Sequence, residues 1–230
     1  MILVLTCEHA GNLVPEKFQD LFKGNEDELQ THRGFDPGAL DLFKVLKPHA
    51  ALSHFQMLSR LVIEMNRSLH STSLFSEFSN PLPAETKQEL LREYYYPYRN
   101  SVEEAIENYL GKGEEVLHLS VHTFTPQWKG EQRNADVGLL YDPKRKKEKE
   151  FCSRFKNAIL ERDPDLKIRF NFPYAGVADG FTTFLRKRFS ENYLGIELEV
   201  NQKFVDNNHM DSGLKMTFSE SISELLQKGN

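Results

Sequence analysis

Cysteine is scarce in this 230-residue chain, which contains only Cys7 and Cys152. Two cysteines are too few for a disulfide framework, and no Cys-x-x-Cys pair offers thiolate ligands to a metal. The chain therefore lacks the composition of a small secreted protein that depends on disulfides, and we expect a cytoplasmic location.

Long apolar runs and an excess of positive charge are also missing. The first apolar run, residues 2–6, is too short for the core of a signal peptide, and no run reaches the roughly 20 residues of a membrane span. The net charge of -5 argues against a broad basic surface, and the basic residues 144–147 are typical of a solvated helix start. We therefore expect neither a membrane nor a nucleic acid as a partner.

Apolar residues make up 39% of the chain and alternate between strand and helix spacing. The predicted strands are residues 2–6, 50–56, 61–64, 115–121, 136–140, 167–170 and 193–200. The predicted helices are residues 14–22, 39–46, 84–110 with a break at Pro97, 146–160, 181–189 and 217–227, and residues 70–83 are predicted as a loop. This pattern predicts one α/β domain over residues 1–230, with helices on both faces of a mixed, mostly parallel sheet in a three-layer α/β/α arrangement.

The first predicted strand runs directly into the polar side chains of Glu8 and His9. Ligands of open α/β sheets bind outside the carboxyl ends of strands, so these residues are candidates for chemistry. The alternative for His9 is a hydrogen-bonded loop residue without a catalytic role. Cys7 as a nucleophile activated by His9 or His122 is a further alternative, but a cysteine after an apolar run is more typical of packing.

Three predicted strands carry ligating or ionisable groups, namely His9, His122 and Glu197. Two histidines and a carboxylate, with a fourth position for water, form the usual ligand set of a catalytic zinc ion. The three residues lie far apart in the sequence and no His-Glu-x-x-His motif is present, so spacing alone does not establish a metal site. Asp36, which precedes Pro37, has the pattern of a helix N-cap.

Candidate substrate contacts come from an asparagine and three arginines. Asn66 and Arg67 follow the predicted strand 61–64, where an amide and a planar guanidinium suit a substrate carboxylate or carbonyl. The alternative for Arg67 is a surface ion pair. Arg60 and Arg133 are weaker candidates for the same role.

Several blocks of the sequence resemble one enzyme family. They are Thr6–Asn12 with Pro15, Asp36–Ala39, Ser59–Arg67, Val121–Pro126, Asn171–Tyr174 and Gly195–Glu197. In this order they are similar to the N-formylglutamate amidohydrolase family. The resemblance implies a carboxypeptidase-like α/β/α fold, one divalent metal, expected to be Zn²⁺, and hydrolysis of a small N-acyl amino acid such as N-formylglutamate.

The resemblance also implies roles for individual residues. His9 and His122 would be metal ligands, and Glu197 would be the general base that acts on a metal-activated water. Asn66 and Arg67 would hold a substrate carboxylate.

Two departures from the family pattern bear on these roles. Carboxypeptidase-like enzymes take their carboxylate ligand from a His-x-x-Glu motif, but here Asn12 occupies the fourth position. We expect Asp36 as the third metal ligand, with Glu8 and Asn12 as alternatives. Glu199 stands where the motif often has arginine, and a second carboxylate near the site would repel an acidic substrate.

The competing interpretations are an amidase or carboxypeptidase with another small substrate and a binding protein that keeps the fold without turnover.

Overall fold

A six-stranded sheet forms the centre of the computed structural model, which describes residues 1–227. The strands are β1 (Ile2–Cys7), β2 (Leu52–Phe55), β3 (Val116–Phe124), β6 (Val137–Leu140), β7 (Ile168–Phe170) and β8 (Tyr193–Asn201). In the spatial order β2-β1-β3-β8-β6-β7, the first four strands are parallel, and β6 and β7 run in the opposite direction. The predicted mixed, mostly parallel sheet is therefore confirmed.

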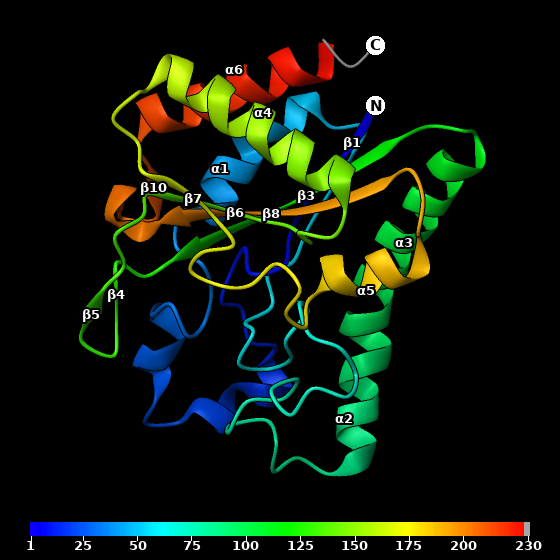
Figure 1. Ribbon diagram of the computed structural model, residues 1–230. Coiled ribbons are helices and arrows are strands. Elements are labelled where there is room, and N and C mark those ends of the chain that lie inside the picture. The colour runs from blue at the N-terminus through cyan, green and yellow to red at the C-terminus, as the bar shows by residue number, and fades with distance from the viewer. Residues whose placement is uncertain (228–230) are drawn as a thin grey trace.

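Helices cover both faces of this sheet (Figure 1). One face is covered by α1 (Ala39–Leu46), α4 (Lys146–Arg162) and α6 (Ser212–Gln227). The other side carries α2 (Ala84–Leu90), α3 (Tyr96–Gly111) and α5 (Phe181–Arg188). The predicted α/β class is confirmed, and no helix among residues 1–227 has the length and apolar character needed to cross a membrane.

The two faces of the sheet differ in chemistry, because side chains alternate along a strand. The face towards α1, α4 and α6 is mostly apolar, with buried residues such as Leu5, Leu119 and Ile196. The opposite face becomes polar towards the carboxyl ends of β1, β3 and β8. Its polar residues are Thr6, Glu8, His118, Ser120, His122, Glu197 and Glu199.

The predicted strand at residues 61–64 is wrong. Leu61 and Val62 lie in a turn and residues 63–64 have irregular backbone. The side chains of Leu61, Val62 and Ile63 are buried in a second apolar cluster beneath the sheet. A short buried apolar run gives the same signal in a strand and in a packed loop, which explains the error. Asn66 and Arg67 consequently follow a turn and not a strand.

Other boundaries also differ from the prediction. The helix expected over 84–110 is divided into α2, a π-helical segment (Leu91–Tyr95) and α3, with Pro97 in the first turn of α3, where its missing N–H is tolerated. The helix expected over 14–22 is a 3₁₀ helix at Glu16–Phe22. Further short elements were not predicted. They are 3₁₀ helices at Glu26–Gln30, Lys47–His49 and Gln202–Phe204, and the strands β4 (Gln127–Trp128), β5 (Glu131–Gln132), β9 (Val205–Asp206) and β10 (His209–Met210).

Candidate metal centre

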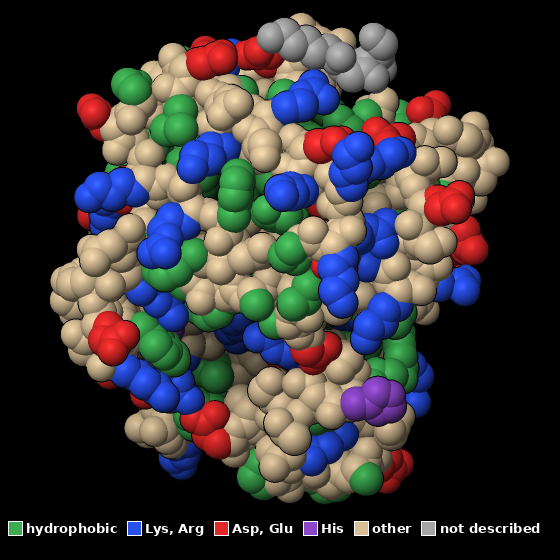
Figure 2. Space-filling view, in the orientation of Figure 1, with side chains coloured by type: hydrophobic (Ala, Val, Ile, Leu, Met, Phe, Trp, Pro, Cys, Tyr) green, Lys and Arg blue, Asp and Glu red, His purple; other side chains and the backbone are tan. Residues whose placement is uncertain are grey.

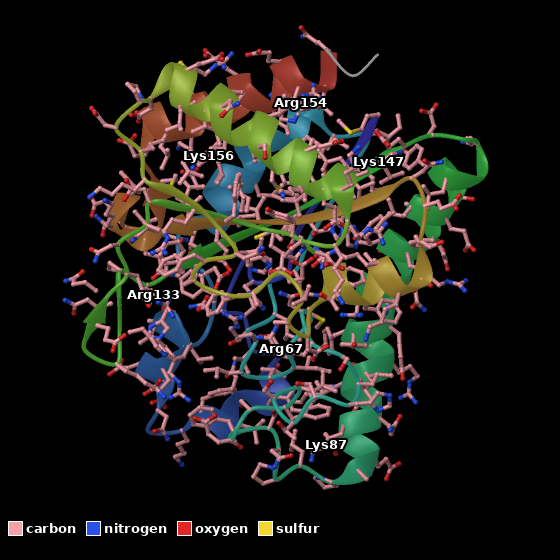
Figure 3. The ribbon with its side chains drawn as sticks, viewed as in Figure 1. Arg67, Lys87, Arg133, Lys147, Arg154 and Lys156 are labelled. Carbon is pink, nitrogen blue, oxygen red and sulfur yellow. The ribbon has the colours of Figure 1, made fainter. Side chains whose placement is uncertain are left out.

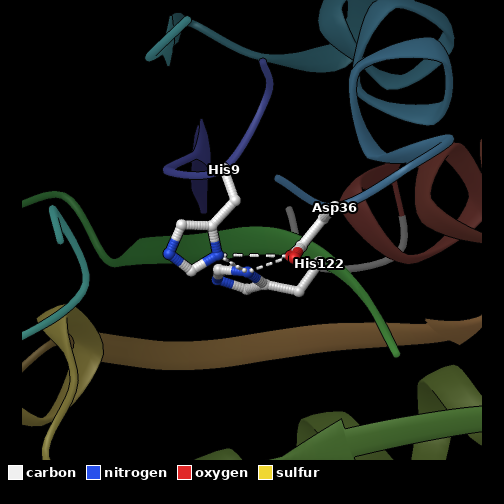
Figure 4. A group of neighbouring side chains, drawn as sticks. All are labelled: His9, Asp36 and His122. Atoms are coloured by element: carbon white, nitrogen blue, oxygen red, sulfur yellow. Dashed lines mark hydrogen bonds and ion pairs between the residues drawn. The ribbon is translucent and has the colours of Figure 1, made fainter. Parts of the chain in front are cut away.

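His9, Asp36 and His122 meet at the polar face of the sheet (Figure 4). Asp36 Oδ2 lies 3.2 Å from His9 Nδ1 and 3.0 Å from His122 Nδ1, and the two Nδ1 atoms are 3.1 Å apart. All three side chains are buried. Two imidazole nitrogens and one carboxylate oxygen therefore converge on one point, which is the donor set of a catalytic zinc site.

Three separate segments bring these side chains together. His9 lies two residues beyond the end of β1, and His122 lies within β3, which runs further than predicted. Asp36 belongs to the loop before α1, and its backbone N–H donates to the carbonyl of His9 over 3.0 Å. The N-cap of α1 is Gly38 without a side-chain cap, so the interpretation of Asp36 as a capping residue is wrong.

Each histidine makes its second contact with another buried carboxylate. His9 Nε2 lies 2.5 Å from Glu64 Oε1, and His122 Nε2 lies 3.2 Å from Glu8 Oε2. An ionised carboxylate only accepts hydrogen bonds, so each Nε2 carries a hydrogen, and a ring without a proton on Nδ1 presents the Nδ1 lone pair to the centre. Glu8, an alternative third ligand in the sequence, thus lies behind His122.

The role of Glu64 was missed by the sequence reasoning. The signal in the sequence is that Glu64 directly follows the apolar run 61–63. Such a run is typical of a buried segment, and acidic residues are seldom buried without a partner. Arg60 is that partner, because its guanidinium spans Glu64 Oε2 at 3.0 Å and Asp36 Oδ1 at 2.9 Å. Arg60 therefore fixes the position of Asp36, a candidate ligand, relative to Glu64, the carboxylate that contacts His9.

The charges at the centre suit a divalent cation. Burial alone would raise the pKa values of Asp36 and Glu64, but the charges of Arg60 and His9 hold both pKa values well below their usual range. Burial also opposes ionisation of Glu8, whose pKa is nevertheless lowered by the hydrogen bond and the charge of His122. Three ionised carboxylates then face one arginine. With both histidines neutral, the residues in contact leave a charge of -2 for a bound ion to balance.

His122 holds a proton when no ion competes for its Nδ1. Burial alone would lower the pKa of His122, but its hydrogen bonds with Asp36 and Glu8 raise the pKa well above the usual value. A cation that binds Nδ1 must displace this proton.

Two glutamates of β8 lie on the same face as His122. In the sheet register Glu197 pairs with Ser120, and Glu199 pairs with His122 itself. Glu197 Oε1 accepts a hydrogen bond from Thr182 Oγ1 over 2.7 Å. Glu199 is buried, and its Oε2 has no hydrogen-bond partner among residues 1–227. Burial is the main reason why the pKa of Glu199 is raised to about 8.

The candidate substrate contacts are distributed differently from the expectation. Arg60 is part of the centre and is occupied by two carboxylates. Asn66 is buried beside α5, where its Oδ1 accepts from the N–H of Phe181 over 2.6 Å. Arg67 lies among the loops beneath the sheet (Figure 3), and its Nη1 donates to the carbonyls of Asn66 and Asp179. Within the described residues, Arg67 has no carboxylate partner.

Arg133 lies beside the β4–β5 hairpin (Figure 3). Its guanidinium is 5.2 Å from the ring of Trp128, 5.3 Å from Tyr174 and 5.8 Å from Phe124. It too has no carboxylate partner in the described part of the chain. Asn12 donates to the carbonyl of Leu29 and to Gln30 Oε1, and thus points towards a different cavity.

A cavity of about 520 Å³ gives access to the centre. Asp36, Arg60 and Glu64 form part of its wall, and Trp128 and Tyr174 form an aromatic part. Figure 2 shows a hollow beneath the sheet on the face in view, with Lys and Arg side chains spread over the surface around it. This volume suits a small organic substrate.

Comparison with known proteins gave consistent results. Residues 1–205 match the N-formylglutamate amidohydrolase family. A gene product of Agrobacterium tumefaciens has a similar structure, with a TM-score of 0.76, 26% identity and coverage of 98% of this chain and 89% of that chain. N-formylglutamate amidohydrolase from Ralstonia eutropha is similar with a TM-score of 0.71, 18% identity and coverage of 99% and 94%. No curated protein matches the chain.

Proposed function

The chain belongs to the N-formylglutamate amidohydrolase family, and we propose that it hydrolyses the amide bond of an N-acyl amino acid such as N-formylglutamate with one bound Zn²⁺. The observation that supports metal dependence is the convergence of His9 Nδ1, His122 Nδ1 and Asp36 Oδ2 in a centre with an excess of negative charge. The wall of the cavity includes Asp36, so a substrate in the cavity would lie next to this centre.

The three converging atoms would hold the ion. A bound Zn²⁺ supplies a water with a pKa near 7 and polarises the scissile carbonyl. Glu64 and Glu8 fix the tautomers of the two histidines, so that both rings offer Nδ1 without rearrangement. Arg60 fixes the orientation of Asp36.

A carboxylate must accept the proton of the attacking water and deliver it to the leaving amine. Glu197 is the candidate from the family resemblance. Glu199 is a second candidate, because it is the register neighbour of His122 and its buried Oε2 has no partner among the described residues, whereas Glu197 Oε1 accepts a hydrogen bond from Thr182. We propose that one of these two glutamates is the general base. For Glu199 this role requires that the charge of a bound cation lower its raised pKa, so that its carboxylate is ionised near pH 7.

Elemental analysis of purified protein tests the proposal. We expect close to one divalent metal per chain in the wild type and a loss of the metal in His9→Ala and in His122→Ala, because each change removes one of three ligands. His209→Ala is the matched control, since that histidine is exposed at 79% of its side-chain surface. Full metal content in either ligand variant would show that the assignment is wrong.

The same measurement decides the third ligand. Asp36→Asn should weaken metal binding at least 10-fold more than Asn12→Ala, whose side chain points elsewhere. Glu8→Gln should have an intermediate effect, since Glu8 acts through His122. If Asp36→Asn binds the metal as tightly as wild type, the role passes to Glu8.

A further inference from the structure

A second cavity, of about 310 Å³, lies between α3, α5 and the loop that follows Arg67. None of the residues in its wall belongs to the wall of the cavity at the metal centre. Its apolar surface comes from Leu69, Tyr95, Tyr96 and Phe184. It is therefore a separate, partly open cavity with room for a small ring or a short aliphatic chain.

The wall of this cavity contains a buried arginine without a counter-ion. Arg99 is only 4% exposed and makes no ion pair with the described residues. Its Nη1 donates to the carbonyls of Met65, at 2.9 Å, and Arg67, at 3.4 Å. No hydrogen bond is made by its Nε and Nη2 within residues 1–227. These two atoms are not fully shielded from solvent, so a ligand in the cavity can reach them.

Aromatic rings hold the guanidinium in place. Its carbon lies 4.2 Å from the ring centre of Phe181, 4.7 Å from Phe184 and 4.9 Å from Tyr95. Cation–π contacts of this kind fix the plane of the group without using its N–H donors. The donors therefore remain oriented and available.

The acidic residues of the wall have other partners. Asp179 Oδ2 accepts from the N–H and the hydroxyl of Ser68, at 3.1 and 3.2 Å. Glu103 is ion-paired with Arg188. Lys187, also in the wall, has no ion pair among the described residues. Within the described part of the chain, Arg99 and Lys187 are thus the cations of the wall without an ion pair, and Asp179 is the anion without one, so the cavity has an excess of one positive charge. A guanidinium matches a carboxylate through paired N–H donors.

We propose that this cavity binds a small organic carboxylate with an apolar or aromatic body. The carboxylate accepts hydrogen bonds from Arg99, and the body packs against Tyr96 and Phe184. The site goes beyond the proposed hydrolysis, because it shares no wall residue with the metal centre.

Isothermal titration of the full chain with benzoate and with its neutral counterpart benzamide tests the proposal. We expect saturable binding of benzoate and at least 10-fold weaker binding of benzamide. Because a carboxylate can also bind a metal, the titration is repeated with His9→Ala. Binding in the second cavity persists in this variant, whereas binding at the metal centre does not.

Variants locate the binding site. Arg99→Met should weaken benzoate binding at least 10-fold, and Leu69→Trp, which fills the cavity from an exposed loop position and leaves Arg99 intact, should do the same. Arg154→Gln, a change on the distant helix α4 (Figure 3), is the control and should bind as wild type does. The proposal is overturned if benzoate shows no saturable binding below about 10 mM, or if Leu69→Trp binds it as tightly as wild type.

Discussion

At the scale of single residues, the geometry of the candidate centre depends on the residues that contact His9, His122 and Asp36 from behind as much as on the three converging atoms. Glu64 contacts Nε2 of His9 and Glu8 contacts Nε2 of His122, which leaves Nδ1 as the only nitrogen of each ring that faces the proposed ion. Arg60 joins Glu64 to Asp36. The orientation of all three candidate ligands is thus set by residues that do not themselves reach the common point.

The two glutamates of β8 should respond differently to substitution. We expect Glu199→Gln to lower kcat about 100-fold or more while metal content is kept, because the partner-free oxygen of Glu199 lies on the strand position paired with His122. Glu197→Gln is the matched variant, and we expect a smaller loss of kcat. Steady-state kinetics on an N-formyl amino acid measures both. The reverse order would assign the base to Glu197.

Arg67 is expected to act on binding and not on the chemical step. It has no carboxylate partner among the described residues, so Arg67→Ala should raise KM for substrates with a free carboxylate and leave KM for the carboxamide counterpart nearly unchanged. Lysine should restore the preference only in part, since it lacks the planar fork. Arg133→Ala is the comparison variant. If only Arg133→Ala removes the preference, Arg133 is the residue that binds the carboxylate.

At the scale of elements, one buried ion pair joins the two helical layers. Glu148 in α4 and Arg186 in α5 lie on opposite sides of the sheet, and their carboxylate and guanidinium meet at 3.0 Å. Both also bind the backbone of Gly195 in β8, through its N–H and its carbonyl. This pair therefore fixes the position of α5 relative to β8. Because Thr182 of α5 donates a hydrogen bond to Glu197, the pair also helps to position the surroundings of Glu197.

Removing one partner of this pair should be strongly destabilising. Arg186→Met leaves Glu148 buried with a weakened set of partners and should lower the free energy of unfolding by about 3–5 kcal/mol. The control is Arg188→Gln in the same helix, where the arginine is exposed and paired with Glu103 and Glu107, and a loss under about 1 kcal/mol is expected. Urea unfolding measures both. Equal losses in the two variants would contradict the assigned role of the buried pair.

At the scale of the whole molecule, we propose that the chain unfolds as one domain. The two apolar clusters pack against opposite faces of the same strands, so neither cluster keeps its shape without the sheet. A single cooperative transition, with the same midpoint by circular dichroism and by calorimetry, is the behaviour that this arrangement predicts.

His118, a buried histidine, should make a contribution to stability that is lost in mild acid. Burial lowers the pKa of His118 to about 4, against about 6.5 in the unfolded chain. Between these values the unfolded chain binds more protons, so this contribution to stability is complete above about pH 6.5 and is lost as the pH falls towards 4. Wild type should lose about 2 kcal/mol more than His118→Gln between pH 7 and pH 5.

Urea unfolding at a series of pH values measures this difference. Asp36 and Glu64 do not affect this comparison above pH 5. Their pKa values are lowered in the folded chain, so the stability that they contribute is lost only when the pH falls below the ordinary carboxyl pKa of about 4. Equal slopes for wild type and His118→Gln would contradict the assignment.

The sequence by itself determined the order and type of most elements. The helix α1 was predicted at its observed bounds, because its apolar residues recur at helical spacing and proline and glycine precede it. The strands β1, β3 and β8 were predicted because their apolar runs are rich in aliphatic residues and end near polar side chains. The sequence also named His9, His122 and Asp36 as candidates, mainly through the resemblance to a known family.

Only the tertiary structure decided which polar groups meet. His9 and His122 are separated by 113 residues, so their contact depends on strand order and register, which local spacing does not encode. The same reason explains why Glu64 was missed and why Glu199, although noted as a carboxylate near the site, was not named as a candidate base. Each has an ordinary local sequence and becomes distinctive only through burial and through the partner it meets or lacks. Tertiary packing also made residues 61–64 a buried segment of turn and irregular backbone, since an apolar run records that a segment is buried but not the shape in which it is buried.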